Sequence, residues 1–135
     1  MIEIQIDYSE FEKLEKQFLN LQDTDYNTAF TLRKKSASLM DYFGQIKATQ
    51  DKSKAKNQLI AKGKEAEIKR EYIEKYKVSR GREEYIADPR VVVVNEEYFN
   101  SIEICGKLES LINYLGSIYY ISQSVYDRGQ KGGNY

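Results

Sequence analysis

The fold is decided by residues 96–126, EEYFNSIEICGKLESLINYLGSIYYISQSVY. Apolar side chains recur in this segment at steps of three and four residues, which places them on one face of an α-helix. Asn95 precedes the segment as an N-cap, and Glu96 and Glu97 fall in the first turn, where the helix dipole favours acids. We therefore expect a long helix whose apolar face forms the core or an oligomer surface. The residues predicted for that role are Phe99, Ile102, Leu108, Ile112, Leu115 and Tyr119.

Helical periodicity also covers most of the chain before this segment. A short helix is expected from Ser9 to Leu21, followed by helical stretches over residues 26–49 and 53–77. The residues between 26 and 77 include no proline, so the two stretches can form one long helix or a hairpin. The second stretch has only a narrow apolar stripe, which leaves most of that helix facing solvent or a charged partner. The stripe consists of Ala55, Leu59, Ala66, Ile73 and Tyr76.

Two short segments have the composition of strands. Isoleucines alternate with polar residues over positions 2–6, and Val91–Val94 is a run of four β-branched residues. Asp88-Pro89 is expected to hold an extended connector before the valine run. The predicted fold class is therefore mainly α, with long antiparallel helices and two short β segments, 2–6 and 91–94, that could pair. We expect a single helical domain over residues 1–128 and a flexible tail over 129–135.

The residue types that are missing limit the chemistry. The chain has no histidine and one cysteine, which removes the usual general-base relays, nucleophile pairs and zinc-ligand sets. Lys62-Gly63-Lys64 lacks the other residues of a phosphate-binding loop. We therefore expect no enzyme activity, no cofactor and no metal. The chain has no run of 18 apolar residues and no charged-then-apolar leader, so a cytoplasmic protein without a membrane span is expected.

The net charge is zero, yet the charges are segregated along the chain. Residues 1–27 have seven acids and two bases, whereas residues 83–135 have eight acids and four bases. Between them, residues 28–50 have four bases and one acid, and residues 51–82 have eleven bases and five acids. A basic centre suggests a polyanionic partner. The alternative is that the acidic and basic segments neutralise each other within the fold or between subunits.

The basic segment contains the candidate nucleic-acid-binding residues. Lysines and arginines bind phosphates by charge and counterion release, and aromatic rings stack on unpaired bases. Tyr72 and Tyr76 lie beside the cations and could serve as stacking faces, or they could belong to the core. The candidates are Lys62, Lys64, Lys69, Arg70, Tyr72, Lys75, Lys77 and Arg80.

The order of these features resembles the UvsY-type family of phage recombination mediators. The resemblance covers about residues 28–129 and rests on four segments: Ile68-Lys-Arg-Glu-Tyr72, Ser79-Arg-Gly81, Val91-Val-Val-Val-Asn-Glu-Glu97 and Tyr126-Asp-Arg-Gly129. It implies a homo-oligomer that binds single-stranded DNA and helps to load a RecA-like recombinase against a single-strand-binding protein. By this resemblance the DNA contacts fall on Lys69 and Arg70, with Lys62 and Lys64 before them. Family members continue past this point into a further helix, which the glycine-rich residues 129–135 are not expected to form.

A second hypothesis belongs to a different class. The long apolar helix and the complementary charged segments also suit a small phage structural or assembly protein, such as a virion connector or adaptor. Such a protein oligomerises without nucleic acid. Its location would be the virion rather than the host cytoplasm.

Overall fold

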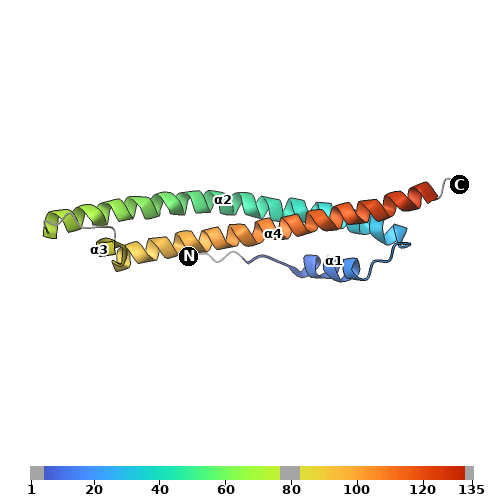
Figure 1. Cartoon of the computed structure of the whole chain (residues 1–135), viewed down its shortest axis with the longest axis horizontal. Coiled ribbons are helices and arrows are strands. Elements are labelled where there is room, and N and C mark those ends of the chain that lie inside the picture. The colour runs from blue at the N-terminus through green and yellow to red at the C-terminus, as the bar shows by residue number, and fades with distance from the viewer. Residues whose placement is uncertain (1–4, 77–82, 133–135) are drawn as a thin grey trace. The chain divides into compact units, whose positions relative to one another are not determined.

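The computed structural model describes residues 5–76 and 83–132, and every element in these ranges is helical (Figure 1). The helices are α1 (Ser9–Leu19), α2 (Tyr26–Tyr76), α3 (Glu83–Ile86) and α4 (Pro89–Gly132). The mainly α prediction is confirmed. Residues 26–76 form one continuous helix, so the choice between a long helix and a hairpin is settled for the described residues. The chain divides into two compact units, and α2 and α4 each contribute to both.

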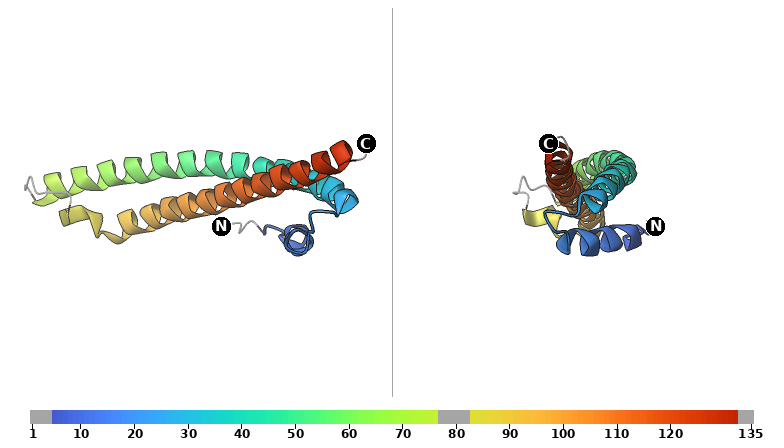
Figure 2. Two further views of the ribbon diagram at one scale, coloured as in Figure 1. Left: turned by 45° about the vertical axis from the view of Figure 1, so that its right-hand side comes forward. Right: turned by 90° about the vertical axis from the view of Figure 1, so that its right-hand side faces the viewer.

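The first unit contains α1, the start of α2 and the end of α4, over residues 5–45 and 110–132 (Figure 2). Its buried residues lie at steps of three and four along α2 and α4, the spacing of helices that pack side by side. Aromatic contacts attach α1 to both helices: Tyr8 stacks on Phe43 and Phe11 meets the edge of Tyr114. The buried residues of this unit are Leu14, Ala29, Leu32, Ser36, Phe43, Leu115, Ile118, Ser122 and Val125.

The second unit contains the end of α2, α3 and the start of α4, over residues 46–76 and 83–109. The two long segments run antiparallel, with α3 next to the point where the chain reverses (Figure 1). Small or polar residues occupy much of the seam between them, and Asn57 Nδ2 donates a hydrogen bond to Ser101 Oγ at 2.7 Å. The buried residues of this unit are Gln50, Ala61, Ile68, Tyr85, Val91, Ser101, Cys105 and Leu108.

The β predictions are wrong for the residues that can be compared. Val91–Val94 lies in the first turns of α4, and Gln5 and Ile6 have no regular structure, while residues 2–4 lie outside the described ranges. Asp88 explains why the valines are helical. Its side-chain Oδ1 accepts a hydrogen bond from the backbone N–H of Arg90, and its carbonyl oxygen accepts from the backbone N–H groups of Val91 and Val92. Asp88 is thus an N-cap, and Pro89 takes the first helical position, which its fixed φ suits. Asn95 lies within the helix and caps nothing.

The apolar face of α4, predicted as core or oligomer surface, is only partly buried within this chain. Leu108 and Leu115 are buried, and Ile112 and Tyr119 are half-buried. Phe99 is 61% exposed and Ile102 is 42% exposed, because the seam in this part of α4 runs through Ser101 and Cys105. Small side chains there let α2 approach closely.

The C-terminal residues differ from the expected tail. Helix α4 continues through Gly132, so residues 129–132 are helical, and residues 133–135 lie outside the described part. In the ranges 5–76 and 83–132, no helix is long and apolar enough to cross a membrane. A single domain over residues 1–128 stays a prediction.

Candidate nucleic-acid interface

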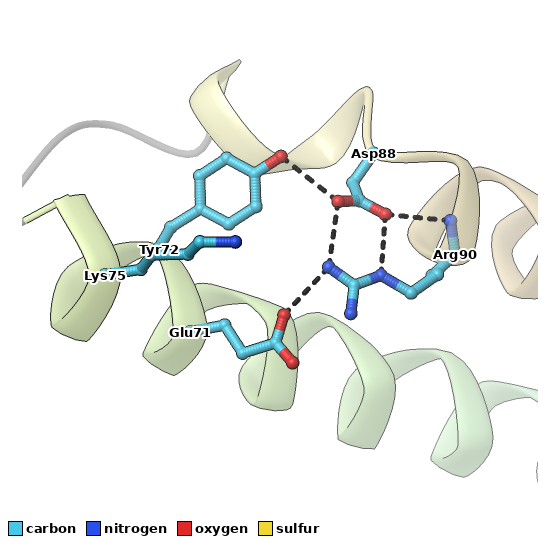
Figure 3. Close-up of a pocket in the computed structure, with 5 residues that line it drawn as sticks. All are labelled: Glu71, Tyr72, Lys75, Asp88 and Arg90. Carbon is cyan, nitrogen blue, oxygen red and sulfur yellow. Dashed lines mark hydrogen bonds and ion pairs between the residues drawn. The ribbon is translucent and has the colours of Figure 1, made fainter.

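Charged groups join the end of α2 to the start of α4 (Figure 3). The Arg90 guanidinium donates to both oxygens of Asp88, from Nε and Nη2, at 3.1 Å each. The same guanidinium lies 2.8 Å from Glu71 Oε2. Tyr72 completes the group by donating its hydroxyl to Asp88 Oδ2 at 3.1 Å. With Lys75, these side chains line a pocket of about 70 Å³.

This network keeps the Asp88 carboxylate ionised. The hydrogen bonds from the side chain and backbone of Arg90 lower the pKa of Asp88 to about 2. In turn, Asp88 and then Glu71 raise the pKa of Arg90. Arg90 and the carboxylates of Asp88 and Glu71 therefore neutralise one another. This arrangement is suited to holding the start of α4 rather than to binding a ligand.

Tyr72 belongs to the hydrophobic cluster beside this network. Ile68, Tyr85 and Val91 are its buried members, and Tyr72 and Ile86 pack against them. The rings of Tyr72 and Tyr85 meet edge to face with centroids 6.4 Å apart. With its ring in the cluster and its hydroxyl bound to Asp88, Tyr72 does not lie among the exposed cations.

The exposed cations lie on the side of α2 that faces away from this core. Exposed positions recur there at steps of four and three residues, which makes them neighbours along one helix face. We call this face the basic outer strip. Its members are Lys52, Ala55, Lys56, Leu59, Lys62, Gly63, Ala66, Lys69, Arg70 and Ile73. It includes the apolar residues that the sequence periodicity favoured for packing, and of these Leu59 is 73% exposed and Ile73 is 42% exposed.

The acids nearest the strip are the exposed Glu67 and Glu74, which lie three and four residues from Arg70 at its edge. Glu67 is 3.4 Å from Lys64 Nζ, and Glu71 is engaged by Arg90. Within residues 5–76 and 83–132, none of the five cations of the strip, Lys52, Lys56, Lys62, Lys69 and Arg70, forms an ion pair. These five side chains are exposed, so their charged groups face solvent.

The structure separates the candidates that the sequence had grouped. Lys62, Lys69 and Arg70 share the strip, whereas Lys64 is half-buried beside it and its pair with Glu67 is a surface contact of small value. Lys75 also lines a second, more open pocket with Glu71, Glu74 and Arg90. Lys77 and Arg80 lie outside the described residues.

Sequence reasoning missed two members of the strip, Lys52 and Lys56. The signal that could have found them is their register, because positions 52, 56, 59, 63, 66, 70 and 73 follow one alternation of four- and three-residue steps. No group of three or more potential metal ligands occurs in the described parts of the chain.

The comparisons with known proteins add no relative: no family model, curated protein or solved structure matches this chain.

Proposed function

We propose that this chain is a single-stranded DNA-binding protein, and that the basic outer strip of α2 is its binding surface. The observation that carries the proposal is the row of five exposed cations that form no ion pair within the described residues. From Lys52 to Arg70 the strip extends for about 27 Å of helix. Such a surface contacts phosphates in any sequence, and most of its affinity comes from counterion release.

Leu59 and Ile73 support a single-stranded rather than a purely duplex ligand. They lie exposed within the strip, so unpaired bases can contact them while the phosphates meet the cations. Tyr72, which lies in the hydrophobic cluster, is not part of the proposed surface. Binding is therefore expected to show little base preference.

The test is a fluorescence anisotropy titration of labelled oligo-dT at several salt concentrations. The wild type should bind at low salt and weaken steeply as salt rises. The variant Lys69→Ala/Arg70→Ala should bind less tightly to every base sequence alike. Its slope of log affinity against log salt should be shallower by about 1.4, since each lost contact with a single strand removes about 0.7.

A matched control is the variant Lys16→Ala/Lys35→Ala. It removes two exposed lysines of the first unit and leaves the strip intact. Its affinity should stay close to that of the wild type. Undetectable oligo-dT binding by the wild type at low salt would end the proposal.

The biological role that we propose is that of a recombination accessory protein. It rests on the resemblance to UvsY-type mediators and on the position of Lys69 and Arg70 in the strip. The expected activity is faster assembly of a RecA-like recombinase on DNA coated with a single-strand-binding protein. A recombinase ATPase assay with and without this chain measures it, and Lys69→Ala/Arg70→Ala should lose the effect.

A second candidate function is assembly, as a structural or adaptor protein. The specific observation in its favour is the exposure of Phe99 and Ile102 on α4, at 61% and 42%. Large apolar side chains grouped on a surface often mark a site of protein association. Sedimentation of the protein without nucleic acid tests this function.

A further inference from the structure

The start of α4 has an exposed face whose composition mirrors that of the basic outer strip. Positions 96, 99, 103 and 106 follow three- and four-residue steps, and 102 and 109 lie beside them. We call this face the acidic outer strip. Its members, all exposed, are Glu96, Phe99, Ile102, Glu103, Gly106 and Glu109. At its edge, Lys107 Nζ lies 3.1 Å from Glu103 and is the strip's nearest cation on α4.

The two strips match in charge and in apolar content. One presents lysines and an arginine around Leu59 and Ile73, and the other presents glutamates around Phe99 and Ile102. Like charges face each other if two copies of the same strip meet, which costs free energy, whereas opposite charges face each other if the basic strip meets the acidic strip. Charge therefore selects the pairing of unlike strips.

Both strips also include small residues beside the apolar ones. Gly63 and Ala66 lie between Leu59 and Ile73, and Gly106 follows Phe99 and Ile102. A methyl group added at Gly63 or Gly106 would meet nothing within 4 Å, so packing inside this chain does not require either glycine. Glycine within a helix lowers its stability relative to alanine. A close approach by another helix accounts for small residues at these two positions.

The strips cannot meet within one copy of the second unit, because each lies on the side of its helix that faces away from the shared core. We therefore propose that the occupant of the acidic outer strip is the basic outer strip of a second copy of this chain. Because the two strips face away from the core on opposite sides of the helix pair, two copies form a dimer through one such contact, and the strips at its two ends can add further copies. The proposal does not depend on DNA binding. Where both hold, DNA and the second copy compete for the same cations.

A charge-swap experiment on the full chain, without nucleic acid, tests the pairing by analytical ultracentrifugation at low salt. One variant reverses the basic strip, Lys62→Glu/Lys69→Glu/Arg70→Glu, and the other reverses the acidic strip, Glu96→Lys/Glu103→Lys/Glu109→Lys. Each variant alone should sediment as a monomer, because both of its contacts become repulsive. An equimolar mixture should form dimers and larger oligomers in which the variants alternate, since one kind of contact is then of wild-type polarity and the other is reversed but still complementary.

The control is Lys16→Glu/Lys35→Glu/Lys131→Glu, which reverses three exposed lysines outside both strips and should dimerise like the wild type. Circular dichroism verifies that every variant keeps its helices, since all substituted side chains are exposed. A wild type that stays monomeric at low salt overturns the proposal, as does a mixture that stays monomeric. Failure of the DNA proposal looks different: oligo-dT binding is absent while the charge-swap pattern is present.

Discussion

At the residue scale, Asp88 has the most consequential position in the described chain. It caps α4, accepts two hydrogen bonds from the Arg90 guanidinium and accepts another from Tyr72. A single carboxylate thereby sets where the last helix begins and ties it to α2. The sequence Asp88-Pro89 predicted an extended connector. That prediction is wrong, because the hydrogen bonds of Asp88 start a helix at Pro89.

The low pKa of Asp88 has a consequence for stability against pH. In the unfolded chain this pKa should be near 3.9, whereas in the fold it is about 2, so folding favours the ionised form. The resulting stabilisation is complete above about pH 5 and declines as the pH falls through about 4 toward 2. We expect Asp88→Asn, which retains capping ability, to unfold at lower urea concentration than the wild type at pH 7.

The same comparison at low pH is the critical measurement. The gap in urea midpoint between wild type and Asp88→Asn should narrow as the pH is lowered toward 2, because the wild-type carboxylate becomes protonated. Tyr72→Phe serves as a control that removes one hydrogen bond and keeps the ion pairs. A gap that stays constant over this pH range would contradict the role given to the charge of Asp88.

Two glycines should respond in opposite ways to the same substitution. Gly44→Ala, outside both strips, meets nothing within 4 Å and should raise the free energy of unfolding by about 0.5–1 kcal/mol through helix propensity. Gly129→Ala should leave the free energy of unfolding unchanged or lower it, because the added methyl group would overlap the ring of Tyr26. Urea unfolding of both variants measures the difference, and equal gains would contradict the packing of Tyr26 on Gly129.

At the element scale, α4 shows how context overrides local preference. Valines favour strands, but in α4 they are divided between a buried and an exposed side: Val91 is fully buried, while Val93 is 54% exposed. In a strand Val91 and Val93 would share one face, whereas in this helix they lie on different sides and Val91 packs with Ile68 and Tyr85. Tertiary packing therefore outweighed β-propensity.

The two valines provide a matched test of this helix. Val91→Ala should lower the free energy of unfolding by about 1.5–3 kcal/mol, the value of a buried side chain of this size. Val93→Ala should be neutral or stabilise by up to about 0.5 kcal/mol, because alanine is the better helix former and little apolar burial is lost. Similar losses at both positions, measured by urea unfolding, would argue against the helical register of α4.

At the scale of the whole molecule, the segregation of charge along the sequence becomes a segregation of surfaces. The expectation that acids might neutralise the basic centre within the chain is met only locally, by pairs such as Lys64 with Glu67 and Arg90 with Glu71. The cations of the basic outer strip remain without ion pairs in the described structure. These cations are the groups that the proposed partners, DNA or a second copy, would contact.

Removing apolar surface without changing charge should separate the two proposed uses of this molecule. Phe99→Ser/Ile102→Ser should abolish the dimer while each chain still binds oligo-dT, because the basic outer strip is unchanged. Tyr120→Ser/Ile121→Ser removes comparable exposed apolar surface, 71% and 50% exposed, from the first unit and should leave both properties intact. Ultracentrifugation and anisotropy report the two properties, and an unchanged dimer in the first variant would contradict the docking of α4.

The sequence by itself determined that the chain is helical, because three- and four-residue spacing persists over most of its length. It also excluded those sites that require histidine, since the chain has none. It placed Lys62, Lys69 and Arg70 correctly as near neighbours on one helix face. These conclusions depend on local periodicity and on residue type, which are visible without tertiary contacts.

Only the tertiary structure decided which face of each helix is inside. In α2, both the set with Leu59 and Ile73 and the set with Ala61 and Ile68 have helical spacing, and the partner helix buries the second. In α4, the seam through Ser101 and Cys105 leaves the larger Phe99 and Ile102 outside, because small side chains allow two helices to approach. Spacing shows that residues share a face, but the buried face is the one that finds a complementary neighbour.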